Sequence, residues 1–226
     1  MLNNIEQTKC KDKPELAKIF QRFSWLFKAS LTKVLGAKKL SQVEITIQNV
    51  VITGAFNEGV NLDIAHSKLE GSKCSWRRFP GLIYKLKMPS ATFLLFRNGK
   101  FVCTGTKSEV KGKEAIASFL DMLKAKGLVS AECNFECGVK NLVASVTING
   151  ASVSLEQFTK QFEAAVYEPD KFPAAVYNME GSKATFLVFL TGKLICSGVG
   201  DEDALKRTVK KFYDLLVEKK VLEITA

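Results

Sequence analysis

This sequence of 226 residues lacks the usual features of membrane proteins and enzymes. No apolar run approaches the roughly 18–20 residues of a membrane-spanning helix, and no secretory signal is found at the polar N-terminus. The single histidine, His66, has no acid or cysteine at catalytic spacing, and there is no carboxylate pair or glycine-rich phosphate loop. The six cysteines favour reduced thiols, and Cys133 and Cys137 alone are too few ligands for zinc. We therefore expect no enzyme activity, cofactor, metal or membrane contact.

Positive charge is in excess. The sequence has 33 lysine and arginine residues against 23 acidic residues, which gives a net charge of +10 and a pI near 9.3. A basic surface favours nucleic acid or another polyanion as partner, although charge can also serve solubility alone. Hydrophobic residues make up 46% of the chain, which is ample for a core in one domain or in two fused halves.

One stretch of the chain occurs largely twice. Residues 79–105 read FPGLIYKLKMPSATFLLFRNGKFVCTG, and residues 172–198 read FPAAVYNMEGSKATFLVFLTGKLICSG. Each position of the first stretch has its counterpart 93 positions later without a gap, as Phe79 has in Phe172. Two copies are too few for a repeat array. We therefore expect two similar half-domains that share one sheet about a pseudo-twofold axis.

The repeat divides the chain into three parts. Residues 44–132 form repeat one, residues 133–226 form repeat two, and residues 1–43 have no counterpart. In this N-terminal extension, apolar residues at helical spacing after Pro14, mixed with lysine and arginine, predict a basic amphipathic helix. Such a helix could pack on the protein's own body, serve as a partner-binding or regulatory arm, or lie on a membrane.

Repeat one predicts four strands and two helices. Asn61 and Ser108 are expected to cap the helices, and Gly127 to end the second one. The Asn98-Gly99 pair predicts a hairpin, because such turns need positive φ. The strands are expected over residues 45–53, 80–88, 91–97 and 100–105.

Repeat two predicts the same order. A strand is expected over residues 139–147, followed by a capping box of Ser154 and Gln157 at a short helix. Thr191-Gly192 takes the place of the hairpin turn, and Asp201 begins a cluster of acids that suits the N-terminus of the last helix.

Both faces of the expected sheet are apolar. Alternate residues of a strand point to opposite faces. Thr92, Leu94 and Phe96 share one face, and the residues between them are also apolar. The helices can cover only one face, and the other keeps an apolar surface whose polar groups are small hydroxyls and the amides of Asn49 and Asn141. That surface suits a DNA minor groove, or else contact with another chain or a further layer of structure.

Five segments resemble the conserved core of the TATA-binding protein family, and the resemblance covers about residues 44–220. They are QNVV at Gln48–Val51, RRFPGLIYKL at Arg77–Leu86, FRNGKFVCTGTKSE at Phe96–Glu109, YEPDKFPAAVY at Tyr167–Tyr177 and FLTGKLICSG at Phe189–Gly198. The resemblance implies an α+β saddle with a ten-stranded curved antiparallel sheet and four helices on its convex side. It also implies a nuclear transcription initiation factor that kinks TATA or A·T-rich promoter DNA through the minor groove and nucleates the preinitiation complex.

The resemblance assigns DNA contacts to individual residues. The family intercalates two pairs of phenylalanines, here Phe79 with Phe96 and Phe172 with Phe189. The polar minor-groove contacts are Asn49, Asn141, Thr104 and Ser197, the last in place of a threonine. The apolar ones are Val51, Val143, Leu94, Leu187, Val102 and Ile195. The phosphate contacts are Arg78, Lys85, Lys100, Lys107, Lys183 and Lys193, whereas Asn178 and Gly200 stand where basic residues are usual.

The resemblance also concerns protein partners. Glu168 and Asp170 match acidic residues that a TFIIB-like factor grips, but Lys171 replaces a leucine there. The long helix of repeat one has lost part of the basic surface that binds TFIIA-like factors, so that partner is left open. The alternative is a related factor or an accessory module whose concave face binds a protein partner, a second copy or its own N-terminal helix. The four phenylalanines favour DNA.

Overall fold

The computed structural model describes residues 43–75 and 79–224. The helix expected in the N-terminal extension and Arg78 lie outside these residues. Repeat one contains β1 (Val43–Phe56), α2 (Leu62–Lys68), β2 (Lys73–Ser75), β3 (Phe79–Leu86), β4 (Ala91–Phe96), β5 (Lys100–Thr106) and α3 (Glu109–Ala125). Repeat two contains β6 (Phe135–Ile148), β7 (Ala151–Val153), α4 (Leu155–Gln161), β8 (Ala165–Val166), β9 (Ala174–Asn178), β10 (Thr185–Phe189), β11 (Lys193–Val199), α5 (Glu202–Glu218) and β12 (Leu222–Ile224).

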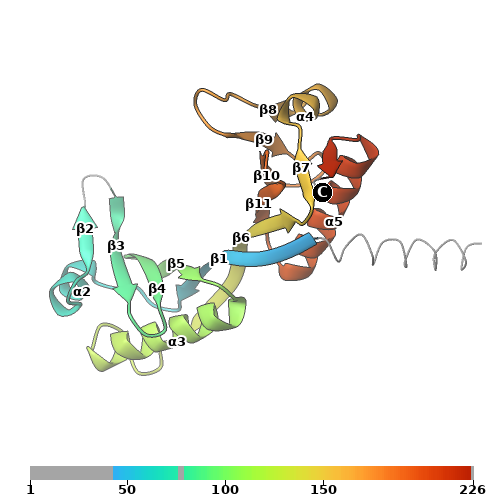
Figure 1. The fold of residues 1–226 in the computed structure, drawn as a ribbon. Coiled ribbons are helices and arrows are strands. Elements are labelled where there is room, and N and C mark those ends of the chain that lie inside the picture. The colour runs from blue at the N-terminus through green and yellow to red at the C-terminus, as the bar shows by residue number, and fades with distance from the viewer. Residues whose placement is uncertain (1–42, 76–78, 225–226) are drawn as a thin grey trace, which may run out of the picture. The chain divides into compact units, whose positions relative to one another are not determined.

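Ten of these strands form a sheet whose order is symmetric about its middle (Figure 1). β1 and β6 are neighbours at the centre. Outward from them follow β5, β4, β3 and β2 in one half and β11, β10, β9 and β8 in the other. Adjacent strands pair antiparallel, as β4 and β5 do with Leu94 opposite Val102. This order confirms the predicted α+β fold of two half-domains that share one antiparallel sheet.

One face of the sheet is buried beneath the two long helices. Both helices bury apolar residues against the sheet, among them Phe119 of α3 and Phe212 of α5. In repeat one Phe93 and Tyr84 stack on Phe119, with ring centroids 4.2 and 5.5 Å away. The equivalent rings of repeat two, Phe186 and Tyr177, lie 4.0 and 5.5 Å from that of Phe212. Each buried phenylalanine stabilises the fold by roughly 1.5–3 kcal/mol.

Local sequence determines where most elements begin and end. The side chain of Asn61 accepts hydrogen bonds from Asp63 N and Ile64 N, and those of Ser108 and Asp201 cap α3 and α5 in the same way. Gly127 follows the end of α3 at φ +58°, as predicted. The predicted capping box is wrong, because Ser154 precedes α4 but its hydroxyl makes no capping hydrogen bond.

The predicted hairpins are confirmed in both repeats. Gly99 has φ +78° and donates its N–H to the carbonyl of Phe96, and Gly192 has φ +73° and donates to Phe189. A side chain at either glycine would also collide with a neighbouring carbonyl oxygen. These positions therefore require glycine for its conformation and for its size.

Repeat two ends in a strand that the sequence pattern did not predict. β12 pairs with β7, with Leu222 opposite Val153, in a separate two-stranded sheet. The described residues contain no helix with the length and hydrophobicity to cross a membrane.

Candidate nucleic-acid interface

The sheet face opposite α3 and α5, here called the open face, carries the residues predicted to enter a minor groove. Residues that point toward the helices, such as Val50, Cys103 and Cys196, have no exposed surface. Their neighbours along the strands point the other way and are partly exposed. These partly exposed residues are Asn49, Val51, Leu94, Val102, Thr104, Asn141, Val143, Leu187, Ile195 and Ser197.

The four predicted intercalating phenylalanines meet in two pairs. The rings of Phe79 and Phe96 lie edge to face with centroids 5.6 Å apart, and those of Phe172 and Phe189 with centroids 6.1 Å apart. Phe96 ends β4 and Phe189 ends β10, so the pairs occupy equivalent positions in the two repeats. Phe172 is 44% exposed although it is a large apolar residue. Their contact with DNA stays a prediction.

A bulge in each repeat orients an asparagine of the open face. Opposite Val51 the pairing of β1 with β5 slips, and Gly105, at φ +92°, turns its N–H out of the ladder. That N–H donates to Oδ1 of Asn49 over 2.8 Å. The equivalent slip lies opposite Val143, where Gly198 donates to Oδ1 of Asn141 over 2.7 Å. With each carbonyl oxygen held by the backbone, the amide Nδ2 remains as the donor.

The two asparagines differ in their remaining contacts. Nδ2 of Asn49 donates to Oγ1 of Thr104 over 3.0 Å, and this hydroxyl also lies 3.1 Å from Oδ1 of Asn49. Within residues 43–75 and 79–224, neither Nδ2 of Asn141 nor the hydroxyl of Ser197 has a hydrogen-bond partner. The two repeats therefore present different polar groups at equivalent positions.

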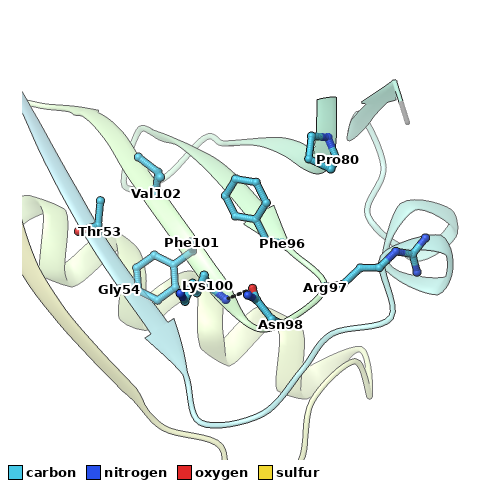
Figure 2. A pocket seen from close by; sticks show the side chains of 9 residues that line it. All are labelled: Thr53, Gly54, Pro80, Phe96, Arg97, Asn98, Lys100, Phe101 and Val102. Atoms are coloured by element: carbon cyan, nitrogen blue, oxygen red, sulfur yellow. Dashed lines mark hydrogen bonds between the residues drawn. The ribbon is translucent and has the colours of Figure 1, made fainter. Parts of the chain in front are cut away.

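A hollow of about 700 Å³ lies at the outer part of the open face in repeat one (Figure 2). Its lining is mostly apolar, with Phe96 and Val102 extending from neighbouring strands and Pro80 near the start of β3. Arg97 turns toward α2, where its Nη2 lies 2.9 Å from Oδ2 of Asp63. The hollow thus places Phe96, a predicted intercalating residue, beside an apolar recess with basic residues at its rim.

The predicted phosphate contacts lie at the exposed ends of strands and turns. Lys85, Lys100 and Lys107 are exposed in repeat one, and Lys183 and Lys193 in repeat two. Asn178 is exposed as well, and its Oδ1 accepts from Oγ1 of Thr185 over 2.8 Å. Gly200 has no atom within 4 Å of where a side chain would begin. Both sites in repeat two could therefore hold a basic side chain but do not.

The predicted partner site lies in the loop between β8 and β9. Lys171 Nζ forms an ion pair with Oε2 of Glu168 over 3.0 Å, and Lys171 N and Phe172 N both donate to the carbonyl of Glu168. The residue that replaces a leucine of the family therefore neutralises one of the two predicted acids. Asp170 is exposed and makes no ion pair with any residue that the structure describes.

Burial and local hydrogen bonds act on several other titratable groups. Burial raises the pKa of Cys103 and Cys133 to about 11 and that of Cys196 to about 12, so these thiols stay protonated. A hydrogen bond from Ser130 N lowers the pKa of the partly exposed Glu58. His66 is exposed and its Nδ1 lies 2.8 Å from the hydroxyl of Ser72. The part of the chain that the structure describes contains no cluster of metal-binding residues.

Gly105 and Gly198 are the functional positions that the sequence pattern missed. They stood out there only as equivalent members of the repeat, although they hold both asparagines. Their repetition directly after Thr104 and Ser197 is the feature that could have indicated a bulge. Thr53 and Pro80 of the hollow carried no such indication.

Together these features define a class of protein: two fused α+β half-domains whose shared sheet is packed against helices on one face and presents an apolar, amide-centred surface on the other. The family sequence model described as "Transcription factor TFIID (or TATA-binding protein, TBP)" matches residues 44–126 and again 136–219. The chain belongs to this family.

Individual relatives agree with this assignment. The TATA-box-binding protein of Methanocaldococcus jannaschii is 33% identical over 180 residues, which are 80% of this chain and 97% of that protein. The one from Pyrobaculum islandicum is 38% identical over 182 residues, with 79% and 88% covered. The solved structure of Methanococcus jannaschii TBP superposes with a TM-score of 0.71 at 34% identity, over 77% of this chain and 99% of that one.

Proposed function

We propose that this chain binds TATA-type, A·T-rich promoter DNA in the minor groove through its open face. The observation that carries the proposal is the pair of oriented amides. Because glycine N–H groups hold Oδ1 of Asn49 and Asn141, each amide offers its nitrogen as a donor at the centre of an apolar face. A·T pairs present only acceptors in the minor groove, whereas G·C pairs add a donor. Two donors among apolar groups therefore favour A·T pairs.

The phenylalanine pairs supply a means of kinking the duplex. Phe79 with Phe96 and Phe172 with Phe189 are placed equivalently in the two repeats, and apolar wedges of this kind unstack base steps in the minor groove. The unstacking costs about a few kcal/mol per step, and contact between the bent duplex and the open face offsets it. We therefore place one kink at each end of the bound site.

On this proposal the protein is a non-enzymatic initiation factor. In a cell that has a nucleus, it acts there. It would nucleate a preinitiation complex by presenting the loop with Glu168 and Asp170 to a TFIIB-like factor. The ion pair between Glu168 and Lys171 supports weaker docking there than two free acids would give. The alternative is a related or accessory module whose open face takes a protein, a second copy or the N-terminal extension.

A bending assay tests the proposal. The full chain is mixed with a duplex that contains a TATA core and a fluorescent dye at each end, and energy transfer reports the distance between the ends. We expect a bend that is largely lost in Phe96→Ala and in Phe189→Ala, and retained in Val110→Ala, which alters an exposed residue of α3. Absence of bending with and without residues 1–43 would refute the proposal. Bending only without them would favour the alternative in which the extension covers the face.

A further inference from the structure

The difference between the two amide clusters has a consequence for how DNA sequence is recognised. In repeat one the hydroxyl of Thr104 is held against the Asn49 amide, 3.0 Å from its nitrogen and 3.1 Å from its oxygen. Because threonine is branched at Cβ, fixing the hydroxyl also fixes its methyl group. In repeat two the hydroxyl of Ser197 has no partner among the described residues, and there is no methyl group.

We propose that Ser197 lets repeat two accept a G·C pair at the base pair that it faces, whereas Thr104 makes repeat one reject a G·C pair at the equivalent position. This inference rests on the proposed minor-groove function. It concerns one base pair in each half of the site. A glycine N–H holds the side-chain oxygen of the asparagine in the same way in both repeats. We therefore expect the two asparagines to disfavour guanine equally at the base pairs that they face.

The reason lies in the amino group that guanine adds to the minor groove. This group needs space and an acceptor for its hydrogen, and leaving a buried donor without a partner is unfavourable. The Thr104 hydroxyl is already engaged with Asn49, and Thr104 carries a methyl group that Ser197 lacks. The Ser197 hydroxyl can rotate and accept from guanine, because both of its lone pairs are available.

Because the repeats are pseudo-symmetric, a self-complementary TATATATA core allows a test without knowledge of the binding orientation. One duplex carries a single G·C substitution, and a second carries the same substitution in both halves. On the duplex with one substitution, the protein can bind in the orientation that places repeat two at the G·C pair. On the duplex with two substitutions, repeat one must face a G·C pair in either orientation. The substitution is placed at each position of the half-site in turn, and the full chain is titrated by fluorescence anisotropy at constant salt.

The expected pattern differs among three proteins. At one position of the half-site, the unsubstituted chain should lose less than about threefold in affinity with the single substitution, and on the order of tenfold or more with the double one. Thr104→Ser should tolerate both duplexes. Ser197→Thr should reject both. Each variant keeps a hydroxyl. The ratio of its affinity for a substituted duplex to its affinity for the all-A·T duplex therefore isolates the effect of the missing or added methyl group and of the freedom of the hydroxyl.

The outcomes separate this inference from the function on which it rests. If all three proteins bind the all-A·T duplex but lose the same affinity with each substituted duplex, the assignment to Thr104 and Ser197 is wrong while minor-groove binding stands. If the unsubstituted chain rejects even the single substitution at every position, repeat two has no tolerant position and the inference is again wrong. If the chain shows no preference for the all-A·T duplex over a G·C-rich one, both proposals fail.

Discussion

Repeat one and repeat two share a fold but differ in charge. Residues 44–132 contain 13 lysine and arginine residues against 8 acids, a net charge of +5, whereas residues 133–226 contain 11 against 12, a net charge of −1. The stacked aromatic cores are nevertheless the same in both, and both repeats have partly exposed apolar residues on the open face. The apolar pattern thus determines the sheet, while the surface charge of each half determines how strongly it attracts a polyanion. A symmetric fold can therefore bind asymmetrically.

The largest loss of stability is expected from substituting the two glycines of the bulges, Gly105 and Gly198. The repeats differ in the room that each leaves for a side chain there. Gly105 and Gly198 both have positive φ, which is unfavourable for any other residue. A Cβ on Gly198 would in addition overlap the carbonyl oxygen of Lys183, whereas a Cβ on Gly105 would meet nothing closer than Thr92 N at 3.9 Å. We expect Gly198→Ala to lower the free energy of unfolding by about 3 kcal/mol or more and Gly105→Ala by about 1–2 kcal/mol. Urea denaturation measures both, and equal losses would show that the backbone of repeat two yields at this point.

The bulges also mark the limit of what the sequence could predict. The repeat predicts two half-domains that share one sheet, and the alternation of Phe93 with Leu94 predicts its buried and open faces, because these patterns can be read along the chain. The ten strands and four helices followed only from the family resemblance. The bulges depend on how β1 slips against β5 and β6 against β11, which is decided by distant pairing. β12 was missed for the same reason, since its partner β7 lies about 70 residues earlier.

The charge difference can be reduced by restoring two basic residues in repeat two. Asn178→Arg with Gly200→Lys should steepen the slope of log affinity against log salt by about 0.9 for each additional phosphate that the protein neutralises. The structure has room for both side chains, because Asn178 is exposed and Gly200 faces open space. The slope is obtained from anisotropy titrations of a TATA duplex over a series of salt concentrations.

A matched control carries the same two charges elsewhere in repeat two. Gln157 and Ala164 are both exposed, at α4 and in the turn after it, so Gln157→Lys with Ala164→Arg adds the same charge away from the open face. This control should change the slope less than the restored pair does. An identical change in both double variants would mean that net charge alone, rather than local phosphate binding, determines the salt dependence.

The buried thiols are a property that the two repeats share, and they predict lower stability at alkaline pH. Burial raises the pKa of Cys103 to about 11 and that of Cys196 to about 12, from an ordinary value of 9.0. An unfolded thiol therefore releases its proton first, so the stabilisation is complete below about pH 9 and is lost as pH rises toward the folded pKa. Unfolding free energies at pH 8 and pH 10 should fall less for Cys196→Ala than for the unsubstituted chain. An equal fall would assign the effect to other groups, such as the buried tyrosines whose pKa is also raised.

The smallest effect on stability is expected from replacing a lysine that joins the ends of two helices in each repeat. The short helix supplies this lysine in repeat one, and the end of the long helix supplies it in repeat two. In repeat one Lys68 Nζ, at the end of α2, donates to the carbonyl of Lys126 after α3 over 2.8 Å. In repeat two Lys219 Nζ, after α5, donates to the carbonyl of Gln161 at the end of α4 over 2.8 Å. Only Lys219 also lies over an aromatic ring, 5.1 Å from the centroid of Phe162, among the residues described.

Because only Lys219 also contacts an aromatic ring, we expect it to stabilise repeat two more than Lys68 stabilises repeat one. A cation–π contact at an exposed site contributes about 0.5–1 kcal/mol, so Lys219→Met should lower the free energy of unfolding by about 1 kcal/mol and Lys68→Met by about half of that. Lys126→Met is the control. Lys126 of repeat one is equivalent to Lys219, but only its backbone carbonyl accepts the hydrogen bond from Lys68, so its side chain can be replaced without breaking that bond. Denaturation at low and high salt separates the contributions, since charge attraction is screened while the packing of the methionine stem is not. Equal losses for Lys219→Met and Lys68→Met would mean that the Phe162 ring adds nothing, and that the lysine joins the two helices of its repeat equally well from either side.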